Sequence, residues 1–183
     1  MIEHIFGVDP DEPERRGPLA RMDLDIEVGD VITMINGVRV LDAPDHGALL
    51  RTEAGKQVRL RIVDAEDGTE RDVIVIPESQ GESSDRRYHE WEYTRRLRTE
   101  EASDGRIGYV HLRAMGTGDM ADFVRGFYPV FQREGLIIDV RHNNGGNIDS
   151  WVISRLLRKA WSFWQGNAGA PYWNMQYAFR GHL

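Results

Sequence analysis

Two adjacent glycines, Gly145 and Gly146, follow a short apolar run at residues 136–141. A β-branched run of this kind is typical of a buried central strand, and paired glycines permit a reversal that other residues resist. Apolar side chains then recur at helical spacing through residues 148–161. The sequence therefore predicts a strand, a glycine turn and a helix, with backbone N–H groups left open at the turn.

Open N–H groups at the start of a helix, together with the helix dipole, favour a negative charge near Gly145 and Gly146. Two anions suit such a site: a bound phosphate, or an oxyanion that develops during acyl transfer. The phosphate is disfavoured because the chain contains neither G-x-G-x-x-G nor G-x-x-x-x-G-K-[ST]. A glycine turn that only connects strand to helix is the alternative, and the local pattern leaves it open.

Acyl transfer also needs a nucleophile and a base, and the chain offers few candidates. None of the serines stands in a G-x-S-x-G setting. Ser150 is nearest to the glycines, but a serine in the first turn of a helix commonly bonds backbone. His142 adjoins the turn and is either a general base or a packed loop histidine. We expect Asp139 and Arg141 to form a supporting ion pair and His111 to be structural.

Composition excludes several classes of function. The 183 residues carry a net charge of −7, which disfavours a nucleic-acid partner. No apolar stretch approaches the roughly 20 residues of a membrane helix, so no membrane role is expected. The absence of cysteine removes disulfides and thiolate ligands and fits a cytoplasmic protein. No histidine and acid spacing supports a metal site, and we expect no cofactor. The first residues lack a secretory signal.

The chain divides into three regions: residues 1–77, 78–104 and 105–183. The first is β-rich, with strands expected at 2–6, 31–35, 38–40, 58–63 and 73–76 and a short helix at 45–51. The dipeptide Asn36-Gly37 is a typical tight turn between two strands. The second region is a polar linker followed by a charged helix, 86–102, which should bury Tyr88, Trp91 and Leu97; its Arg86-Arg87 pair favours a solvated face.

The sequence pattern of the third region predicts a βαβ unit. Its strands are expected at 107–112 and 135–140, as parallel neighbours, and the helix between them should be capped by Asp119. Residues 161–173 are unusually aromatic. They either line a substrate pocket or subunit contact, or are core residues whose covering partners are missing.

The residues of the first region resemble a PDZ domain of the protease-associated type. The resemblance lies in Gly17-Pro18-Leu19-Ala20, in Ile26-Glu27-Val28-Gly29-Asp30-Val31-Ile32, in Ile35-Asn36-Gly37 and in the Leu49-Leu50 helix. It implies that a peptide adds as a strand beside Gly17, Pro18, Leu19 and Ala20 and beside the helix at 45–53. One departure concerns carboxylate capture: Arg15-Arg16 stands where a Gly-Leu-Gly-Phe loop is usual.

The third region resembles the catalytic core of tail-specific and tricorn-like serine proteases. The likeness is carried by residues 105–112, by residues 135–141 and by Asn144-Gly145-Gly146. The fold it implies is mixed α/β and α+β: a PDZ-like β-barrel or sandwich with short helices, then the βαβ unit of a truncated, crotonase-like core. In that family the glycine pair supplies an oxyanion-hole N–H, and the sequence does not choose between Gly145 and Gly146.

The resemblance implies a fragment of a serine endopeptidase that hydrolyses peptides or unfolded polypeptides. The family's nucleophilic serine follows the next core strand and its histidine precedes the PDZ domain, so both should fall outside this chain, which alone should be inactive. We expect the full-length protein to be a cytoplasmic homo-oligomer. In that family this aromatic region shapes the pocket for the residue before the scissile bond, and an acid there would select basic substrates. Because no acid lies between Trp161 and Trp173, the resemblance implies an apolar preference. The competing hypotheses are a non-catalytic PDZ scaffold and edge-to-edge assembly.

Overall fold

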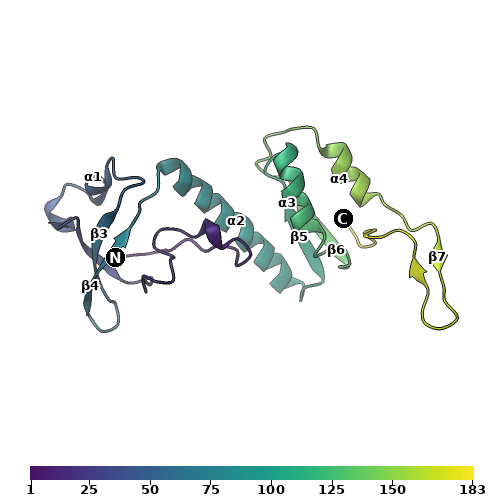
Figure 1. The fold of residues 1–183 in the computed structure, drawn as a ribbon, viewed down its shortest axis with the longest axis horizontal. Helices are drawn as coiled ribbons and strands as arrows, with labels where there is room; N and C mark the ends of the chain where they lie inside the picture. Colours follow the sequence, from purple (N-terminus) through teal and green to yellow (C-terminus); the bar gives the residue numbers. More distant parts are fainter. The chain divides into compact units, whose positions relative to one another are not determined.

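The computed structural model describes all 183 residues, and the chain separates into two compact units, Met1–Tyr93 and Thr94–Leu183 (Figure 1). Each unit has its own hydrophobic core. The long helix α2 (Gln80–Ala102) contains the point of division. No helix has the length and apolar character needed to cross a membrane.

The first unit is built on an open four-stranded sheet in the order β2-β1-β3-β4. All its pairs are antiparallel, and the strands are β1 (Val31–Ile35), β2 (Val38–Arg39), β3 (Val58–Val63) and β4 (Glu70–Val75). Asn36 and Gly37 form the predicted turn, with φ of 49° and 83°. Of the β-barrel or sandwich expected for this unit, the barrel is wrong, because the sheet is open and β2 and β4 remain unpaired edges.

The core of this unit lies under one face of the sheet, and Val58 and Ile62 are fully buried in it. The strand expected at residues 2–6 does not form. Instead, only Ile2 makes backbone hydrogen bonds to the rest of the unit: its N–H donates to the Asp30 oxygen at 2.7 Å, and the Gly29 N–H donates to the Ile2 oxygen at 2.9 Å. The next residues are held by side chains, because His4 contacts the Glu90 carboxylate and Ile5 packs against the core.

Short helical elements complete the first unit. Two 3₁₀ helices, η1 (Pro13–Arg15) and η2 (Val40–Asp42), lie in the connections. Helix α1 (His46–Leu50) forms within the range predicted for it, and the Asp45 carboxylate accepts the Ala48 N–H at 2.8 Å. This contact is the N-cap that lets a helix of five residues form.

Helix α2 begins at Gln80, earlier than the predicted 86, because Ser79 and Glu82 form a capping box. The Ser79 N–H donates to the Glu82 carboxylate at 2.8 Å, and the Glu82 N–H donates to Ser79 Oγ at 3.3 Å. The expected burial of Tyr88, Trp91 and Leu97 is wrong: no α2 residue is buried, and Leu97 is 42% exposed. Polar side chains surround the helix and leave no continuous apolar stripe.

The second unit contains the predicted βαβ arrangement. Strands β5 (Ile107–His111) and β6 (Gly135–Asp139) are parallel, with Ile107 opposite Gly135. Helix α3 (Thr117–Phe127) connects them and buries Phe123 and Phe127 completely. Asp119 is not the N-cap itself; it lies in the first turn and accepts the Gly116 N–H at 2.8 Å.

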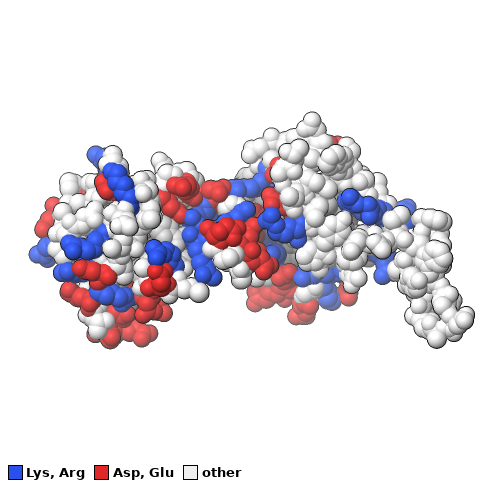
Figure 2. Space-filling view, in the orientation of Figure 1, with Lys and Arg blue, Asp and Glu red and all other residues white.

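After β6 the chain forms helix α4 (Asp149–Leu156) and a small hairpin of β7 (Phe163–Trp164) and β8 (Tyr172–Trp173). Residues 160–179 carry no Lys, Arg, Asp or Glu, and Figure 2 shows this end of the second unit free of charged groups. The chain then returns to β6, where the His182 oxygen accepts the Leu136 N–H at 2.8 Å in a parallel bridge.

Candidate active site

The turn between β6 and α4 places its two glycines in different surroundings. Both have positive φ, 84° at Gly145 and 135° at Gly146. A Cβ at Gly146 would lie 2.1 Å from the Met115 carbonyl oxygen, whereas a Cβ at Gly145 would meet nothing within 4 Å. Glycine is therefore required for space at position 146 and only for backbone conformation at position 145.

The turn is joined to the loop at residues 112–116 by backbone hydrogen bonds. The Met115 carbonyl accepts the N–H groups of Asn147 and Ile148, at 2.8 and 3.1 Å. The Asn144 N–H donates to the Arg113 oxygen at 3.0 Å. The prediction of a turn with generally open N–H groups is thus only partly right, because loop 112–116 consumes three of them.

The two glycine N–H groups also differ. The Gly145 N–H donates to Asn143 Oδ1 at 2.7 Å, while the Gly146 N–H makes no hydrogen bond within the chain and is exposed. The Gly145 carbonyl accepts the Met115 N–H at 2.7 Å. That carbonyl and the Gly146 N–H belong to one planar trans peptide, so they point in opposite directions. The Gly146 N–H is therefore held pointing away from loop 112–116.

A buried polar cluster supports the strand that leads into this turn. Asp139, 8% exposed, accepts the Tyr109 hydroxyl at 2.7 Å and the Arg141 Nε–H at 2.9 Å. The Arg141 guanidinium holds the pKa of Asp139 well below its usual range. Burial, reinforced by Asp139, raises the pKa of Tyr109. The predicted supporting ion pair between Asp139 and Arg141 is confirmed.

His111 is structural, as predicted. It is 5% exposed, and its Nδ1 lies 2.8 Å from the Asp139 carbonyl oxygen, which assigns the proton to Nδ1. Burial lowers the pKa of His111, although its bond to Asp139 acts in the opposite direction. The neutral imidazole therefore acts as a donor that ties the ends of β5 and β6 together.

The structure does not assemble a nucleophile and base from the candidates near the turn. Ser150 is exposed on the first turn of α4, and no serine in residues 1–183 is hydrogen-bonded to a histidine. His142 is exposed and has φ of 61°. No group of three His, Asp or Glu side chains is arranged to hold a metal ion.

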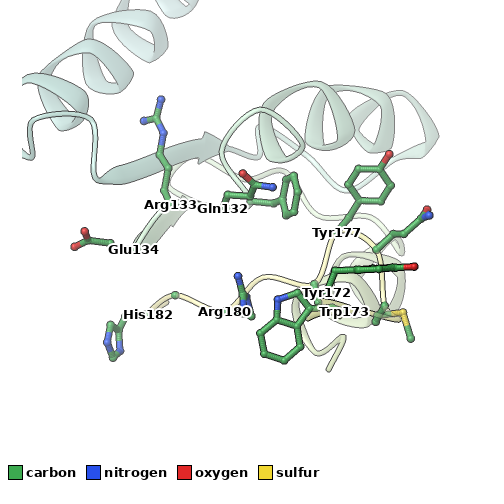
Figure 3. A pocket seen from close by; sticks show the side chains of 13 residues that line it. Gln132, Arg133, Glu134, Tyr172, Trp173, Tyr177, Arg180 and His182 are labelled. Carbon is green, nitrogen blue, oxygen red and sulfur yellow. The ribbon is translucent and has the colours of Figure 1, made fainter. Parts of the chain in front are cut away.

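A pocket of 810 Å³ lies at the opposite end of β6 from the glycines (Figure 3). Its walls include Tyr172, Trp173 and Tyr177, and the Arg180 guanidinium stacks 4.3 Å from the Trp173 ring centre. Part of the aromatic segment thus lines a pocket, while Trp161 remains 77% exposed. The lining begins at residues 131–134, before β6 starts, so this pocket is not the space beside the glycine turn.

The four residues expected to bind peptide lie in a turn and not in an extended strand. The Ala20 N–H donates to the Gly17 oxygen at 3.0 Å, and Pro18 between them has no N–H to offer. Leu19 packs against the core of the first unit. Gly17 is buried beneath the Arg86 side chain, whose Cδ would be 3.2 Å from a Cβ at that position.

Arg86 was missed by sequence reasoning, which assigned the Arg86-Arg87 pair to a solvated helix face. That interpretation is wrong for Arg86: its guanidinium donates to the Arg15 carbonyl oxygen and to the Glu78 carboxylate. Arg87 is exposed, as expected. Helical spacing separates the two neighbours by about 100°, but the contact depends on residues 71 and 8 positions away, so no local signal identifies it.

Comparisons with known proteins find relatives for both units. Residues 1–79 match the tricorn protease PDZ domain, and residues 106–175 match peptidase family S41. Tricorn protease homolog 1 of Streptomyces coelicolor is 32% identical over 93% of this chain and 16% of its own length. Tricorn protease of Thermoplasma volcanium is 26% identical over 87% of this chain and 15% of its own length.

A solved structure supports the same assignment. The crystal structure of the tricorn protease superimposes with a TM-score of 0.79 at 26% identity, over 99% of this chain and 17% of that one. The chain therefore spans about one sixth of the length of the relatives it matches. In both units and in the same order, the chain is similar to tricorn proteases: a match to the tricorn protease PDZ domain is followed by a match to part of peptidase family S41.

Proposed function

We propose that the chain forms the PDZ domain, residues 1–77, a connecting helical region, 78–104, and the first part of a crotonase-like catalytic core, 105–183, of a tricorn-like serine endopeptidase. The substrates are peptides or unfolded polypeptides. The serine nucleophile and histidine base are supplied from outside residues 1–183. The similarity to tricorn proteases in both units, in the same order, supports this proposal.

The observation that carries the proposal is the unpaired, outward-pointing N–H of Gly146. When a serine oxygen bonds to the scissile carbonyl carbon, the π electrons of the carbonyl move to its oxygen, which becomes an oxyanion. A preorganised backbone N–H beside that oxygen stabilises the charge without reorganisation. Gly146 is therefore the oxyanion donor of the glycine pair, because the Gly145 N–H is already engaged by Asn143.

Peptide hydrolysis tests the proposal directly. Fluorogenic peptides with apolar residues before the scissile bond would be incubated with the full-length protein and with residues 1–183 alone. We expect hydrolysis, and covalent labelling by a fluorophosphonate, only in the full-length protein. Hydrolysis that resists the fluorophosphonate and stops on adding a metal chelator would overturn the serine mechanism.

We also propose that residues 17–20 and helix α1 bind peptide, so that the PDZ domain delivers substrate. The match to the tricorn protease PDZ domain supports this role. Fluorescent peptides with free and amidated C-termini would be titrated onto the 183-residue chain. No binding of either peptide would remove the role and also the alternative of a non-catalytic scaffold.

Two properties of the full-length protein complete the proposal: cytoplasmic location and assembly into a homo-oligomer. The exposed apolar residues of the second unit, Trp151, Leu157 and Trp161 among them, support assembly because such surfaces are common at subunit contacts. Light scattering on the full-length protein would give the mass, and a monomer would refute the assembly. Fractionation of cells would test the location.

A further inference from the structure

The side chain of Asn143 connects the glycine turn to the end of β5 through both of its polar atoms. Its Nδ2 donates to the Leu112 carbonyl oxygen at 2.8 Å, and its Oδ1 accepts the Gly145 N–H at 2.7 Å. These partners fix the orientation of the amide, because a flipped side chain would face a carbonyl with its oxygen and an N–H with its nitrogen. The side chain is half-buried.

The two peptide units on either side of Gly145 are each held by one contact. The unit before it is held through the Gly145 N–H by Asn143, and the unit after it through the Gly145 carbonyl by the Met115 N–H. The second of these units carries the Gly146 N–H. With both planes fixed, φ and ψ of Gly145 are fixed as well, although glycine alone would leave them free. Of these two contacts, only the one from Asn143 is made by a side chain.

We infer that Asn143 is a positioning residue for the proposed reaction. Its side chain removes the Gly145 N–H from competition and fixes the peptide plane before Gly145. Together with the Met115 contact to the Gly145 carbonyl, this fixes the orientation in which the Gly146 N–H is presented. Asn143 does not touch the substrate; it acts through the two glycines. This inference rests on the proposed function for its catalytic meaning, whereas the geometry that it describes stands on the hydrogen bonds alone.

Two substitutions separate the parts of this role. Asn143→Asp keeps an oxygen for the Gly145 N–H but loses the Nδ2–H donor to Leu112, and Asn143→Ala loses both contacts. Asn144→Ala is the matched control, because the neighbouring Asn144 side chain is exposed and makes no hydrogen bond. The Asn144 backbone N–H keeps its bond to Arg113 in that variant.

Amide hydrogen exchange in the 183-residue chain, followed by NMR, reports the geometry without catalysis. We expect the Gly145 N–H to exchange at least about tenfold more slowly than the Gly146 N–H, because only the former is hydrogen-bonded. Asn143→Ala should abolish the difference, while Asn143→Asp and Asn144→Ala should preserve it. Equal exchange at the two glycines in the unmodified chain, or a difference that survives Asn143→Ala, overturns the inference. If the amides of β5 and β6 also lose protection in Asn143→Ala, that variant is unfolded and is set aside. The inference is then judged from the exchange of the two glycine amides in the unmodified chain and in Asn143→Asp.

Kinetics of the full-length protein test the catalytic meaning. A rotated donor stabilises the oxyanion less but leaves substrate binding alone, so Asn143→Ala should lower kcat about 10-fold to 100-fold with KM within about twofold. Asn143→Asp should recover much of the loss, and Asn144→Ala should match the unmodified protein. An unchanged kcat in Asn143→Ala overturns the positioning role. If the unmodified protein hydrolyses no peptide, the proposed function fails instead, and the exchange pattern still decides the geometry.

Discussion

Two segments of the chain were expected to offer backbone groups to an incoming polypeptide, and the structure treats them differently. In the turn at residues 140–148, most N–H groups are engaged, including those on both sides of Gly146, and the Gly146 N–H makes no hydrogen bond. In residues 15–20, the chain folds into a turn whose carbonyls are occupied by Ala20 and Arg86. The comparison teaches that an available backbone donor is produced by what its neighbours engage, and glycine only makes the conformation possible.

The difference proposed between Gly145 and Gly146 is tested most directly by substituting the two glycines separately in the full-length protein. Gly146→Ala forces a Cβ toward the Met115 oxygen, so the donor must move; we expect kcat to fall about 10²-fold to 10³-fold. Gly145→Ala meets no atom and carries only the strain of a left-handed conformation, about 1–2 kcal/mol. Equal losses of kcat in the two variants, with both still folded, would contradict the assignment of Gly146.

The buried cluster of Tyr109, Asp139 and Arg141 should contribute measurably to the stability of the strand that leads into the glycine turn. Tyr109→Phe removes a hydrogen bond to the ionised Asp139, and we expect the 183-residue chain to lose about 1.5–3 kcal/mol of unfolding free energy in urea. Tyr128→Phe is the matched control, because the Tyr128 hydroxyl makes no hydrogen bond. A Tyr109 variant as stable as the control would show that the cluster does not hold the end of β6.

The pH dependence of the same cluster should be set by His111. Its pKa is lowered from 6.5 in the folded chain, mainly by burial, so the unfolded chain binds more protons between the two values. Stability should therefore fall as the pH drops below about 6.5 and continue to fall until the folded-state pKa is reached. Asp139, whose pKa is also lowered, adds a further loss only below its usual 3.8.

His111→Asn isolates this contribution, because the amide Nδ2 can replace the Nδ1 donor without titrating. The groups that face His111 are Asp139, Arg113 and His142, and the substitution leaves them in place. Unfolding free energies at pH 8 and pH 5 should differ less in the variant than in the unmodified chain. An identical difference in both would place the titration elsewhere.

The smallest expected effect concerns the other side of the comparison, the segment at residues 15–20. Arg86→Ala removes the contact to the Arg15 carbonyl and the cover over Gly17, and we expect a loss of about 1 kcal/mol and faster amide exchange at Arg16 and Ala20. The exposed neighbour supplies the control, Arg87→Ala, which should change neither quantity. Unchanged exchange in Arg86→Ala would mean that the segment holds its own turn.

The parts of the fold that were predictable are those set by neighbouring residues. The Asn36-Gly37 turn needs two positive φ angles that this dipeptide adopts readily, and β5 and β6 are recognisable as apolar runs joined by a helix. The strand predicted at residues 2–6 does not form because an apolar pattern alone does not supply a neighbouring strand to pair with. Only Ile2 makes backbone hydrogen bonds to another segment. The burial expected on α2 failed because three apolar residues do not make a stripe on a polar helix.

The candidate site shows the same limit more sharply. The glycine pair and the ion pair between Asp139 and Arg141 were evident from the sequence. The proposed choice of Gly146 over Gly145 was not, because it rests on the Asn143 side chain accepting the Gly145 N–H and on the Met115 carbonyl and N–H, about 30 positions earlier in the chain. A contact of that sequence separation leaves no periodicity or spacing to read.

Through the hydrogen bonds between Met115 and the glycine turn, the position of loop 112–116 affects the orientation of the proposed oxyanion donor. This loop runs from β5 into α3, so a small displacement at the start of α3 is transmitted to the orientation of one amide. Side chains around Met115 that never approach a substrate could therefore tune turnover while leaving affinity untouched. In the proposed endopeptidase, the rate of peptide cleavage would then depend on residues that do not contact the substrate.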